Sequence, residues 1–358
     1  MNTQRFVQSL ARPNIVAMEA YRSARSENPI GGVWMDANEL PWSGNKLVDG
    51  ALDNRYPMPQ PFTILDALAQ FYSVDSSNLL VTRGIDEGID VLIRSFCEAG
   101  EDTILTVEPS YGLYKVAAAL QNCRFETVPL DEENGFALDA SQLIEKIGPN
   151  TKIVILCNPN NPSGNLFAQE AVDAVITAAR DRCLVLIDEA YIEFAKEGTI
   201  IERLVNSPHV VVMRTFSKAW GLAGIRVGVT IAHPAIIALL KKVLAPYPLS
   251  SPSLRALENR MTEEGIRELW RSTAQVAILR EQLSLELCKL SAVRRVLPSA
   301  TNFLLVEVDQ AEAIVNRLRE IGISIRDRSS RKRDYLRISV GTYAENLTIL
   351  ANLREILR

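Results

Sequence analysis

The sequence predicts an α/β fold: a large domain on a mostly parallel sheet of seven strands, a small α+β domain at the C-terminal end, and an N-terminal arm. Seven short runs of residues are almost continuously apolar, as strands buried on both faces of a parallel sheet are. Helical patterns separate most of these runs, and this alternation is typical of parallel sheets. A chain of 358 residues is also too long for one small core.

The regular part of the chain begins with a helix expected at 61–72. Strands rich in Val, Ile and Leu and helices with apolar residues three or four apart follow in turn. The strands are expected at 79–82, 103–108, 124–130, 152–158, 183–190, 210–215 and 225–232. The helices between them are expected at 85–100, 110–120, 139–147 and 168–181.

The C-terminal part follows a proline-rich turn at 245–253. A long helical stretch to about Leu290 precedes further elements: strands at 301–308, 323–328 and 335–340, and helices at 311–321 and 345–357. Residues before 61 show few periodic apolar runs and read as an irregular arm. The chain is therefore divided into an arm at 1–60, expected to pack on the small domain and on a partner subunit, a large domain at 61–255 and a small domain at 256–358.

The composition excludes several functional classes. Lys plus Arg number 39 and Asp plus Glu number 43, and this mildly acidic balance argues against nucleic acid or an anionic membrane as the main partner. The five cysteines are widely spaced and form no CxxC, so we expect reduced thiols. The two histidines lie far from other metal-type ligands, so no metal is expected. No apolar run approaches the ~20 residues that span a bilayer, so we expect a cytoplasmic protein.

Polar residues follow several predicted strands, at the edge where open parallel sheets bind ligands. Gly84, Ile85, Asp86 and Glu87 lie between a strand and a helix, where free N–H groups of the helix N-terminus can bind a phosphate. A glycine there allows close approach to the backbone. The alternative is a simple turn with a helix cap.

Two further strand ends carry residues suited to an aromatic cofactor. Asn161 precedes a proline, which holds it extended and can direct its amide into the cleft, although the segment could also be a plain turn. Asp188 ends an apolar strand, where a carboxylate is costly without a partner. A pyridinium N–H would be such a partner, and Tyr191 could donate to a phenolate oxygen. The alternative for Asp188 is a helix cap.

The last of these places is the segment after the strand at 210–215. Lys218 follows Ser217, and Arg226 lies eight residues later, near enough to share a phosphate with Ser217. Lysine forms Schiff bases with carbonyl compounds when its pKa is lowered. The alternative, a solvated surface lysine, holds for most lysines. The sequence contains no GxGxxG, GxxxxGK[ST] or GxSxG motif, which argues against dinucleotide, nucleotide and serine-hydrolase chemistry.

The order of these groups along the chain resembles the fold type I pyridoxal-phosphate-dependent aminotransferases, the aspartate aminotransferase superfamily. Within it, further segments resemble the histidinol-phosphate aminotransferases; Ser163, where threonine is common, is a small departure. The segments that carry this closer resemblance are Ala20–Arg25, Met35–Glu39, Asn54–Pro57, Arg83–Asp90, Pro109–Gly112, Asp188–Phe194, Ala245–Ser250 and Tyr335–Thr342.

The resemblance implies a role for each matching residue. Lys218 would form the Schiff base with pyridoxal 5′-phosphate, Asp188 would pair with the ring nitrogen, and Tyr111 would stack on the ring. The ring oxygen would be bound by Asn161 and Tyr191. The phosphate would be bound by Gly84, Ile85, Asp86, Glu87, Ser217, Arg226 and, from the partner subunit of a homodimer, Tyr56. The substrate would be bound by Arg337, with Arg326, Tyr21 and Asn38 as further contacts.

The same resemblance implies the reaction. Histidinol phosphate and 2-oxoglutarate would be converted to imidazole-acetol phosphate and glutamate in histidine biosynthesis, by a ping-pong mechanism through the lysine-bound aldimine. Both amines carry an anion near the reacting carbon, and a planar guanidinium suits either. Three alternatives remain open: an aminotransferase for aromatic or other amino acids, a threonine-phosphate decarboxylase, and a cofactor-binding regulatory protein without turnover.

Overall fold

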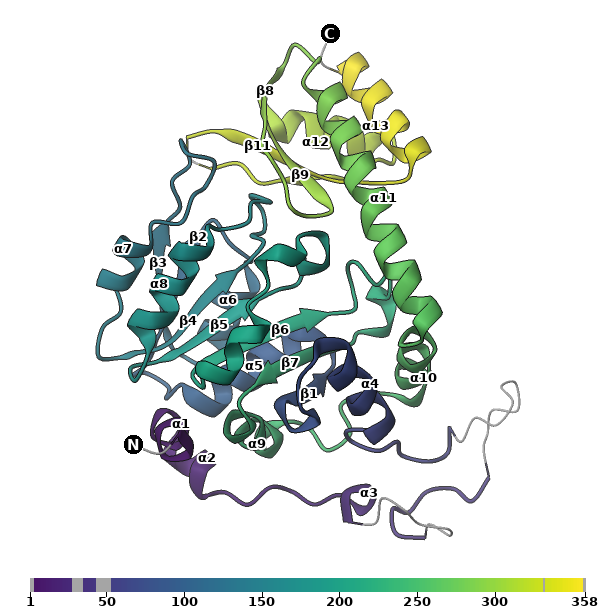
Figure 1. The fold of residues 1–358 in the computed structure, drawn as a ribbon. Coiled ribbons are helices and arrows are strands. Elements are labelled where there is room, and N and C mark those ends of the chain that lie inside the picture. The colour runs from purple at the N-terminus through teal and green to yellow at the C-terminus, as the bar shows by residue number, and fades with distance from the viewer. Residues whose placement is uncertain (1–2, 28–34, 43–52, 331, 357–358) are drawn as a thin grey trace.

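The large domain is built around one seven-stranded sheet in the order β1-β7-β6-β5-β4-β2-β3 (Figure 1). The computed structural model describes residues 3–27, 35–42, 53–330 and 332–356. The strands are β1 (Leu79–Thr82), β2 (Thr103–Glu108), β3 (Arg124–Pro129), β4 (Thr151–Cys157), β5 (Leu184–Asp188), β6 (Val210–Thr215) and β7 (Gly228–Ala232). All neighbouring pairs from β6 to β3 are parallel, and β7 runs antiparallel to both of its neighbours. The predicted fold class is confirmed.

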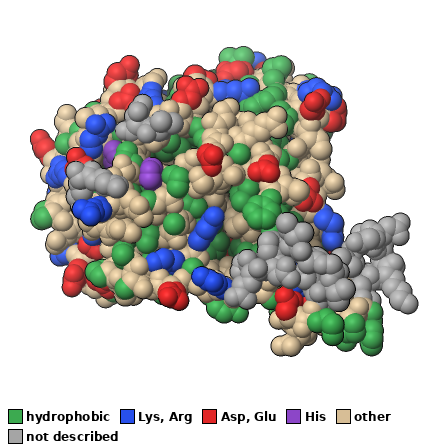
Figure 2. Space-filling model, turned by 60° about the horizontal axis from the view of Figure 1, so that its bottom comes forward, with side chains coloured by type: hydrophobic (Ala, Val, Ile, Leu, Met, Phe, Trp, Pro, Cys, Tyr) green, Lys and Arg blue, Asp and Glu red, His purple; other side chains and the backbone are tan. Residues whose placement is uncertain are grey.

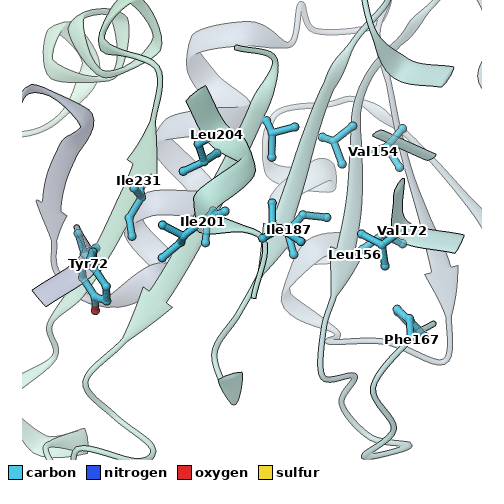
Figure 3. Close-up of a cluster of buried hydrophobic side chains, with 14 of the residues drawn as sticks. Tyr72, Val154, Leu156, Phe167, Val172, Ile187, Ile201, Leu204 and Ile231 are labelled. Atoms are coloured by element: carbon cyan, nitrogen blue, oxygen red, sulfur yellow. The ribbon is translucent and has the colours of Figure 1, made fainter. Parts of the chain in front are cut away.

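Helices cover both faces of this sheet because its strands bury side chains alternately on each side. In β5, for example, Val185 and Ile187 face one layer, while Leu184 and Leu186 face the other. Figure 3 shows part of the first layer, in which Ile187 and Leu156 of the sheet pack near Val172 of α8. The first layer holds α4 (Phe62–Tyr72), α7 (Ala140–Glu145) and α8 (Gln169–Ala179); the second holds α5 (Gly84–Phe96), α6 (Leu113–Leu120) and α9 (Pro234–Val243).

The small domain is an antiparallel sheet in the order β10-β11-β9-β8 with helices on it. Its elements are β8 (Val293–Val296), β9 (Phe303–Val308), α12 (Ala311–Glu320), β10 (Arg326–Asp327), β11 (Asp334–Ser339) and α13 (Tyr343–Ile356). The helix α10 (Ser251–Arg260) precedes α11 (Glu263–Leu287), which runs from the large domain to the small one (Figure 1). The C-terminal residues Leu283 and Leu287 of α11 belong to the small-domain core.

Short 3₁₀ helices connect the larger elements. They are η1 (Ser76–Asn78), η2 (Ile192–Phe194), η3 (Lys196–Gly198), η4 (Ile201–Asn206) and η5 (Ala223–Ile225). Three of them follow β5 in succession, and Ile200, Ile201 and Leu204 of this stretch are buried in the core that packs on the sheet.

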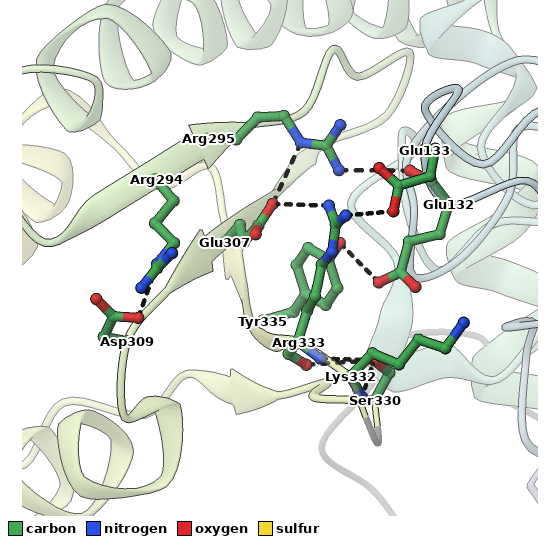
Figure 4. Close-up of polar contacts among 10 residues, drawn as sticks. All are labelled: Glu132, Glu133, Arg294, Arg295, Glu307, Asp309, Ser330, Lys332, Arg333 and Tyr335. Carbon is green, nitrogen blue, oxygen red and sulfur yellow. Dashed lines mark hydrogen bonds and ion pairs between the residues drawn. The ribbon is translucent and has the colours of Figure 1, made fainter.

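A polar network joins the small sheet to the loop after β3 (Figure 4). The Tyr335 hydroxyl donates to Glu132 Oε1 at 2.9 Å, and Arg295 Nη2 donates to the Glu132 carbonyl oxygen at 3.4 Å. Arg333 forms an ion pair with Glu133 and another, at 3.5 Å, with Glu307 of its own sheet. These contacts fix the small domain over one edge of the large sheet.

The N-terminal arm is more regular than expected and packs elsewhere. It contains the helices α1 (Thr3–Leu10), α2 (Pro13–Ala17) and α3 (Ala24–Glu27). Phe6, Val7 and Leu10 are buried in the core that α5 and α9 form on the large domain, and Lys242 of α9 donates to the carbonyl oxygens of Ile15 and Val16. For residues 3–17 the expected packing on the small domain is therefore not met, because this apolar face fits the large domain.

The surface seen from the end opposite the small domain shows Lys and Arg side chains interspersed with Asp and Glu (Figure 2). Neither sign of charge forms a continuous field on this face. Within the residues that the structure describes, no helix combines the length and apolarity needed to cross a membrane.

Candidate active site

A cavity of about 320 Å³ lies where the carboxyl ends of β4, β5 and β6 meet, and the small domain covers it. This is the edge at which the sequence placed its candidate residues. The cavity is lined by Ile85, Asp86, Tyr111, Cys157, Asn161, Asp188, Ala190, Tyr191, Thr215, Ser217, Lys218, Arg226, Arg326, Arg328 and Arg337. Nearly all of the predicted ring and lysine contacts are thus brought together by the fold.

One end of the cavity is suited to a phosphate. The N-terminus of α5 opens here with Gly84 at a φ of 75°, and Arg226 Nη1 donates to Ser217 Oγ at 3.2 Å. A Cβ at Gly84 would lie 2.8 Å from Arg226 Nη2, so only glycine lets the guanidinium lie against this backbone. The free N–H groups of the first turn and the guanidinium together favour an anion. In this structure Arg226 Nη2 instead donates to Asp86 Oδ2 at 3.1 Å.

The opposite wall holds a buried carboxylate. Asp188 ends β5 and is 1% exposed; its Oδ2 accepts from the Tyr114 hydroxyl at 2.6 Å and its Oδ1 from the Ala190 N–H at 3.1 Å. Burial raises the pKa of Asp188 to about 6, against the lowering effect of these two hydrogen bonds. A cationic N–H group placed beside this carboxylate would relieve the cost of its burial.

Sequence reasoning missed Tyr114. It lies in the first turn of α6, three residues after Tyr111, and is completely buried. Its spacing looked like an ordinary helical core position. The signal available in the sequence was a second tyrosine on the same helical face as Tyr111.

The side chain of Lys218 lines the same cavity. Desolvation first, and then the positive charges of Arg337 and Arg226, lower the pKa of the Lys218 amine. A lowered pKa increases the fraction of free amine at neutral pH, which is the form that acts as nucleophile or base.

A hydrogen-bonded chain crosses the cavity from the large domain to the small one. Asn161 Nδ2 donates to the Tyr191 hydroxyl at 3.3 Å, and Asn161 Oδ1 accepts from Arg337 Nη1 at 2.6 Å. Tyr111 lines the cavity with its hydroxyl 3.3 Å from Asp86 Oδ1 and its ring edge-on to Tyr114. Burial raises the pKa of Tyr111 to about 12, so its hydroxyl stays protonated.

The small domain contributes three arginines. Arg326 of β10 is the cross-strand partner of Arg337 of β11, and Arg328 lies two residues further along the same face. Among the described residues no carboxylate forms an ion pair with any of the three. Like charges opposite each other on a sheet are destabilising. Sequence reasoning named Arg326 and Arg337 but missed Arg328, whose two-residue spacing from Arg326 was the available signal.

Besides Gly84, whose backbone lies against Arg226, four predicted residues are not among those that line this cavity. Glu87 caps α5 instead, since its Oε2 accepts from the Arg83 N–H at 2.6 Å. Tyr21 lines a different cavity and is 74% exposed, and Asn38 is exposed with a φ of 55°. Tyr56 stacks on Tyr247 at 4.3 Å in a cavity of about 680 Å³ that shares Arg226 with the active-site cavity.

Comparison with known proteins decides the family. The family model for aminotransferase class I and II matches residues 28–353, most of the chain. The chain belongs to this aminotransferase family. It is a pyridoxal-phosphate-dependent transferase, as the sequence predicted. Within the parts of the chain that can be described, no three His, Cys, Asp or Glu side chains are grouped to hold a metal ion.

Individual members of the aminotransferase family resemble the whole chain. A histidinol-phosphate aminotransferase of Francisella philomiragia is 37% identical over 351 residues, covering 98% of this chain and 95% of that one. Another, from Sodalis glossinidius, is 38% identical over 98% of this chain and 97% of its own. The solved histidinol-phosphate aminotransferase of Sinorhizobium meliloti in complex with pyridoxal 5′-phosphate is 30% identical, with a TM-score of 0.79, over 85% of this chain and 83% of that chain.

The residues of the cavity fit pyridoxal phosphate. The cup at the N-terminus of α5 suits its phosphate, and the buried Asp188 suits a protonated ring nitrogen. Lys218 lines the same cavity, so its amine is available to an aldehyde bound there.

Proposed function

We propose that the protein transfers the amino group between L-histidinol phosphate and 2-oxoglutarate, giving imidazole-acetol phosphate and L-glutamate, in the biosynthesis of histidine. The names of the relatives support this substrate. The observation that carries the proposal is the group of three arginines, Arg326, Arg328 and Arg337, on the wall that faces Lys218 and Asp188. A phosphate monoester and a dicarboxylate are both dianions, and such a wall suits both.

Pyridoxal phosphate, when bound, supplies an aldehyde for the substrate amine and a ring that accepts electrons from the substrate Cα. Lys218 Nζ would accept the proton from the substrate Cα and later give it up, as general base and then general acid, a role typically worth ~10²–10⁴-fold in rate. Asp188 keeps the ring nitrogen protonated. The lowered pKa of Lys218 supports its role, because a protonated amine could not accept the proton.

The remaining cavity residues hold the cofactor. Backbone N–H groups of Ile85 and Asp86, together with Ser217 and Arg226, bind the phosphate. Asn161 and Tyr191 bind the ring oxygen, and Tyr111 stacks on the ring face. For this stacking, ~0.5–1.5 kcal/mol is expected, so Tyr111→Ala weakens activity without abolishing it.

Arg337 is the anion clamp that both substrates share. Its guanidinium is already oriented by Asn161 Oδ1 at 2.6 Å, so little reorganisation is needed on binding. Arg337→Ala should therefore damage both half-reactions, whereas Arg326 contacts the phosphate and should matter more for histidinol phosphate. Damage to only one half-reaction in the Arg337 variant would refute the shared clamp.

A homodimer with shared active sites, located in the cytoplasm, completes the proposal. The arm exposes large apolar side chains that a second subunit would cover: Tyr21, Met35, Leu40, Trp42 and Tyr56. Tyr56 would reach the phosphate of the partner subunit, with Tyr21 and Asn38 near the substrate. Mixing inactive Lys218→Ala and Tyr56→Ala protomers should restore activity, because one site of each hybrid then holds both native residues. No restored activity in verified hybrids would place Tyr56 in its own subunit's site.

The substrate is tested by single turnover. Loaded enzyme mixed with histidinol phosphate should lose the aldehyde-form absorbance within one turnover and release imidazole-acetol phosphate. Histidinol without phosphate, phenylalanine and threonine phosphate are the comparisons. A faster reaction with phenylalanine indicates an aromatic aminotransferase, carbon dioxide release from threonine phosphate indicates a decarboxylase, and no turnover with any amine indicates a regulatory protein.

A further inference from the structure

The carboxylate of Asp188 is held from behind by a residue that does not reach the cavity. Tyr114 is completely buried, and its hydroxyl donates to Asp188 Oδ2 at 2.6 Å, a distance typical of a strong hydrogen bond to an ionised acceptor. One turn of chain at the start of α6 directs Tyr111 into the cavity and Tyr114 beneath it, with the two rings edge-on at 5.6 Å. Tyr114 therefore does not line the cavity itself, and its hydroxyl acts on the site through Asp188.

Tyr114 is a neutral hydrogen-bond donor to Asp188, and other charged and neutral groups also surround this carboxylate. Asp86 raises the pKa of Asp188 and Lys218 lowers it, both from across the cavity. Cys157 at the end of β4, together with Tyr111 and Tyr191, also faces the carboxylate. Burial raises the pKa of Cys157 and of Tyr114, so both stay protonated at neutral pH. As long as Asp188 is ionised, the Tyr114 hydroxyl is therefore the donor and Asp188 Oδ2 the acceptor of this hydrogen bond.

We propose that Tyr114 is a positioning residue that keeps the proton on the cofactor ring nitrogen by hydrogen-bonding to Asp188. The proposal rests on the proposed pairing of Asp188 with that nitrogen. A hydrogen-bonded carboxylate is a weaker base than an unbonded one, because the bond stabilises its ionised form. Asp188 and the ring nitrogen compete for one proton. Because the hydrogen bond from Tyr114 makes Asp188 the weaker base, the proton stays on the nitrogen. Loss of the hydroxyl shifts the proton to the carboxylate.

The test is Tyr114→Phe, which removes one oxygen and keeps the ring. The first measurement uses cofactor-free protein with ¹³C-labelled aspartate, with Asp188→Asn to assign the signal. The Asp188 pKa should rise by about one to two units, the size of one hydrogen bond to a charged group. The second uses pyridoxal phosphate labelled with ¹⁵N in the ring. The ring signal should lie in the pyridinium range in the wild type and move toward neutral pyridine in the variant.

Tyr335→Phe is the matched control, because Tyr335 is also buried and its hydroxyl also donates to a carboxylate, that of Glu132 at 2.9 Å, while Tyr335 does not line the cavity. It should leave both signals unchanged. An unchanged ¹⁵N signal in folded Tyr114→Phe overturns the inference, whether or not the ¹³C pKa moves. A neutral ring nitrogen in the wild type would instead overturn the proposed role of Asp188.

Discussion

At the scale of single residues, the buried Glu193 shows how a carboxylate without a hydrogen-bond partner makes the stability of the folded protein depend on pH. Glu193 follows the active-site segment after β5 and is 3% exposed, yet neither carboxylate oxygen accepts a hydrogen bond among the described residues. It borders a second cavity, of about 1020 Å³. Burial raises the pKa of Glu193 to about 7 from its usual 4.5. Because the folded pKa is the higher one, the folded protein holds this proton more tightly than the unfolded chain.

Glu193→Gln should therefore stabilise the protein only at higher pH. As pH rises from about 4.5 to about 7, the wild type loses stability at this site, and above that range the loss is complete. The gain of the variant over the wild type should be near zero at pH 4.5 and reach ~3 kcal/mol at most at pH 8. Denaturant unfolding at a series of pH values measures it. Glu263→Gln, at a 92%-exposed side chain, should show no such dependence, and an equal gain at both pH extremes would contradict the assignment.

Arg328 is a second residue whose role can be measured separately. Its guanidinium lines the cavity and has no carboxylate partner among the described residues. Arg328→Gln should raise KM for histidinol phosphate about tenfold or more, the size of one hydrogen bond between charged groups, with kcat little changed. The control is Arg319→Gln on the exposed side of α12. Equal KM values for variant and wild type would show that two arginines suffice.

At the scale of elements, the close contact between β7 and the start of α5 determines the shape of the phosphate cup. A Cβ at Gly228 would lie 2.5 Å from the Ile85 nitrogen and 2.6 Å from the Gly84 carbonyl carbon. No side chain fits between these backbones. The close approach of β7 to the N-terminus of α5 therefore requires glycine at position 228.

Gly228→Ala should displace the N-terminus of α5 and weaken cofactor binding at least tenfold. It should also destabilise the fold by ~1–3 kcal/mol, the usual cost of an overpacked core site. Equilibrium titration with pyridoxal phosphate and thermal unfolding measure the two effects. Gly224→Ala is the control, because a Cβ there meets nothing within 4 Å. Similar cofactor affinity in both variants would show that the cup tolerates the displacement.

Helices and strands could be predicted from the sequence where the pattern of apolar side chains is enough to define the element. Six of the seven strands of the large sheet lie within the expected ranges, and β4 begins one residue earlier, at Thr151. These strands could be found because runs such as 184–188 and 210–215 are buried on both faces. The same property hid the reversed direction of β7, since a strand buried on both faces looks alike in either direction. The predicted strand 323–328 shortens to Arg326–Asp327, and the arm helix α1 was missed because its apolar face is only three residues wide.

Site residues could likewise be predicted where the sequence pattern marks them, and could not where their role depends on neighbours in space. Residues at strand ends, such as Asp188 and Lys218, could be found because their polarity interrupts an apolar pattern. Tyr114 and Arg328 could not be separated from ordinary core and surface residues, since their meaning depends on what lies opposite them in space. Glu87 was read as a ligand residue but caps its own helix, a use that the same position allows equally well.

On the scale of the whole molecule, the active site is closed by polar contacts between two domains. The network around Glu132, Glu133, Arg333 and Tyr335 connects the loop after β3 to the sheet that carries the three arginines (Figure 4). The side chain of Glu133 is 78% exposed, so its pair with Arg333 should contribute little by itself. The three arginines of the cavity are therefore positioned in part by this exposed ion pair, beside the apolar contacts that Leu297, Leu305 and Tyr335 make with the core of the large domain.

Replacing both acids, Glu132→Gln with Glu133→Gln, should loosen the small domain. We expect KM for both substrates to rise about two- to fivefold, as the loss of one or two exposed pairs of ~0.2–1 kcal/mol implies. Amide exchange along β11 should accelerate. Asp309→Asn removes an ion pair with Arg294 inside the same sheet and is the control. Faster exchange in the control as well would mean that the sheet itself, rather than its attachment, had been weakened.

The three arginines of the cavity also have a practical consequence for handling the protein. Three guanidinium groups that form no ion pair with a carboxylate among the described residues attract small dianions from the buffer. Sulfate and inorganic phosphate should therefore act as competitive inhibitors, and kinetic constants measured in phosphate buffer should differ from those measured in an amine buffer with chloride. The same affinity suggests sulfate as an additive that protects the protein during purification and is then removed by dialysis before assay.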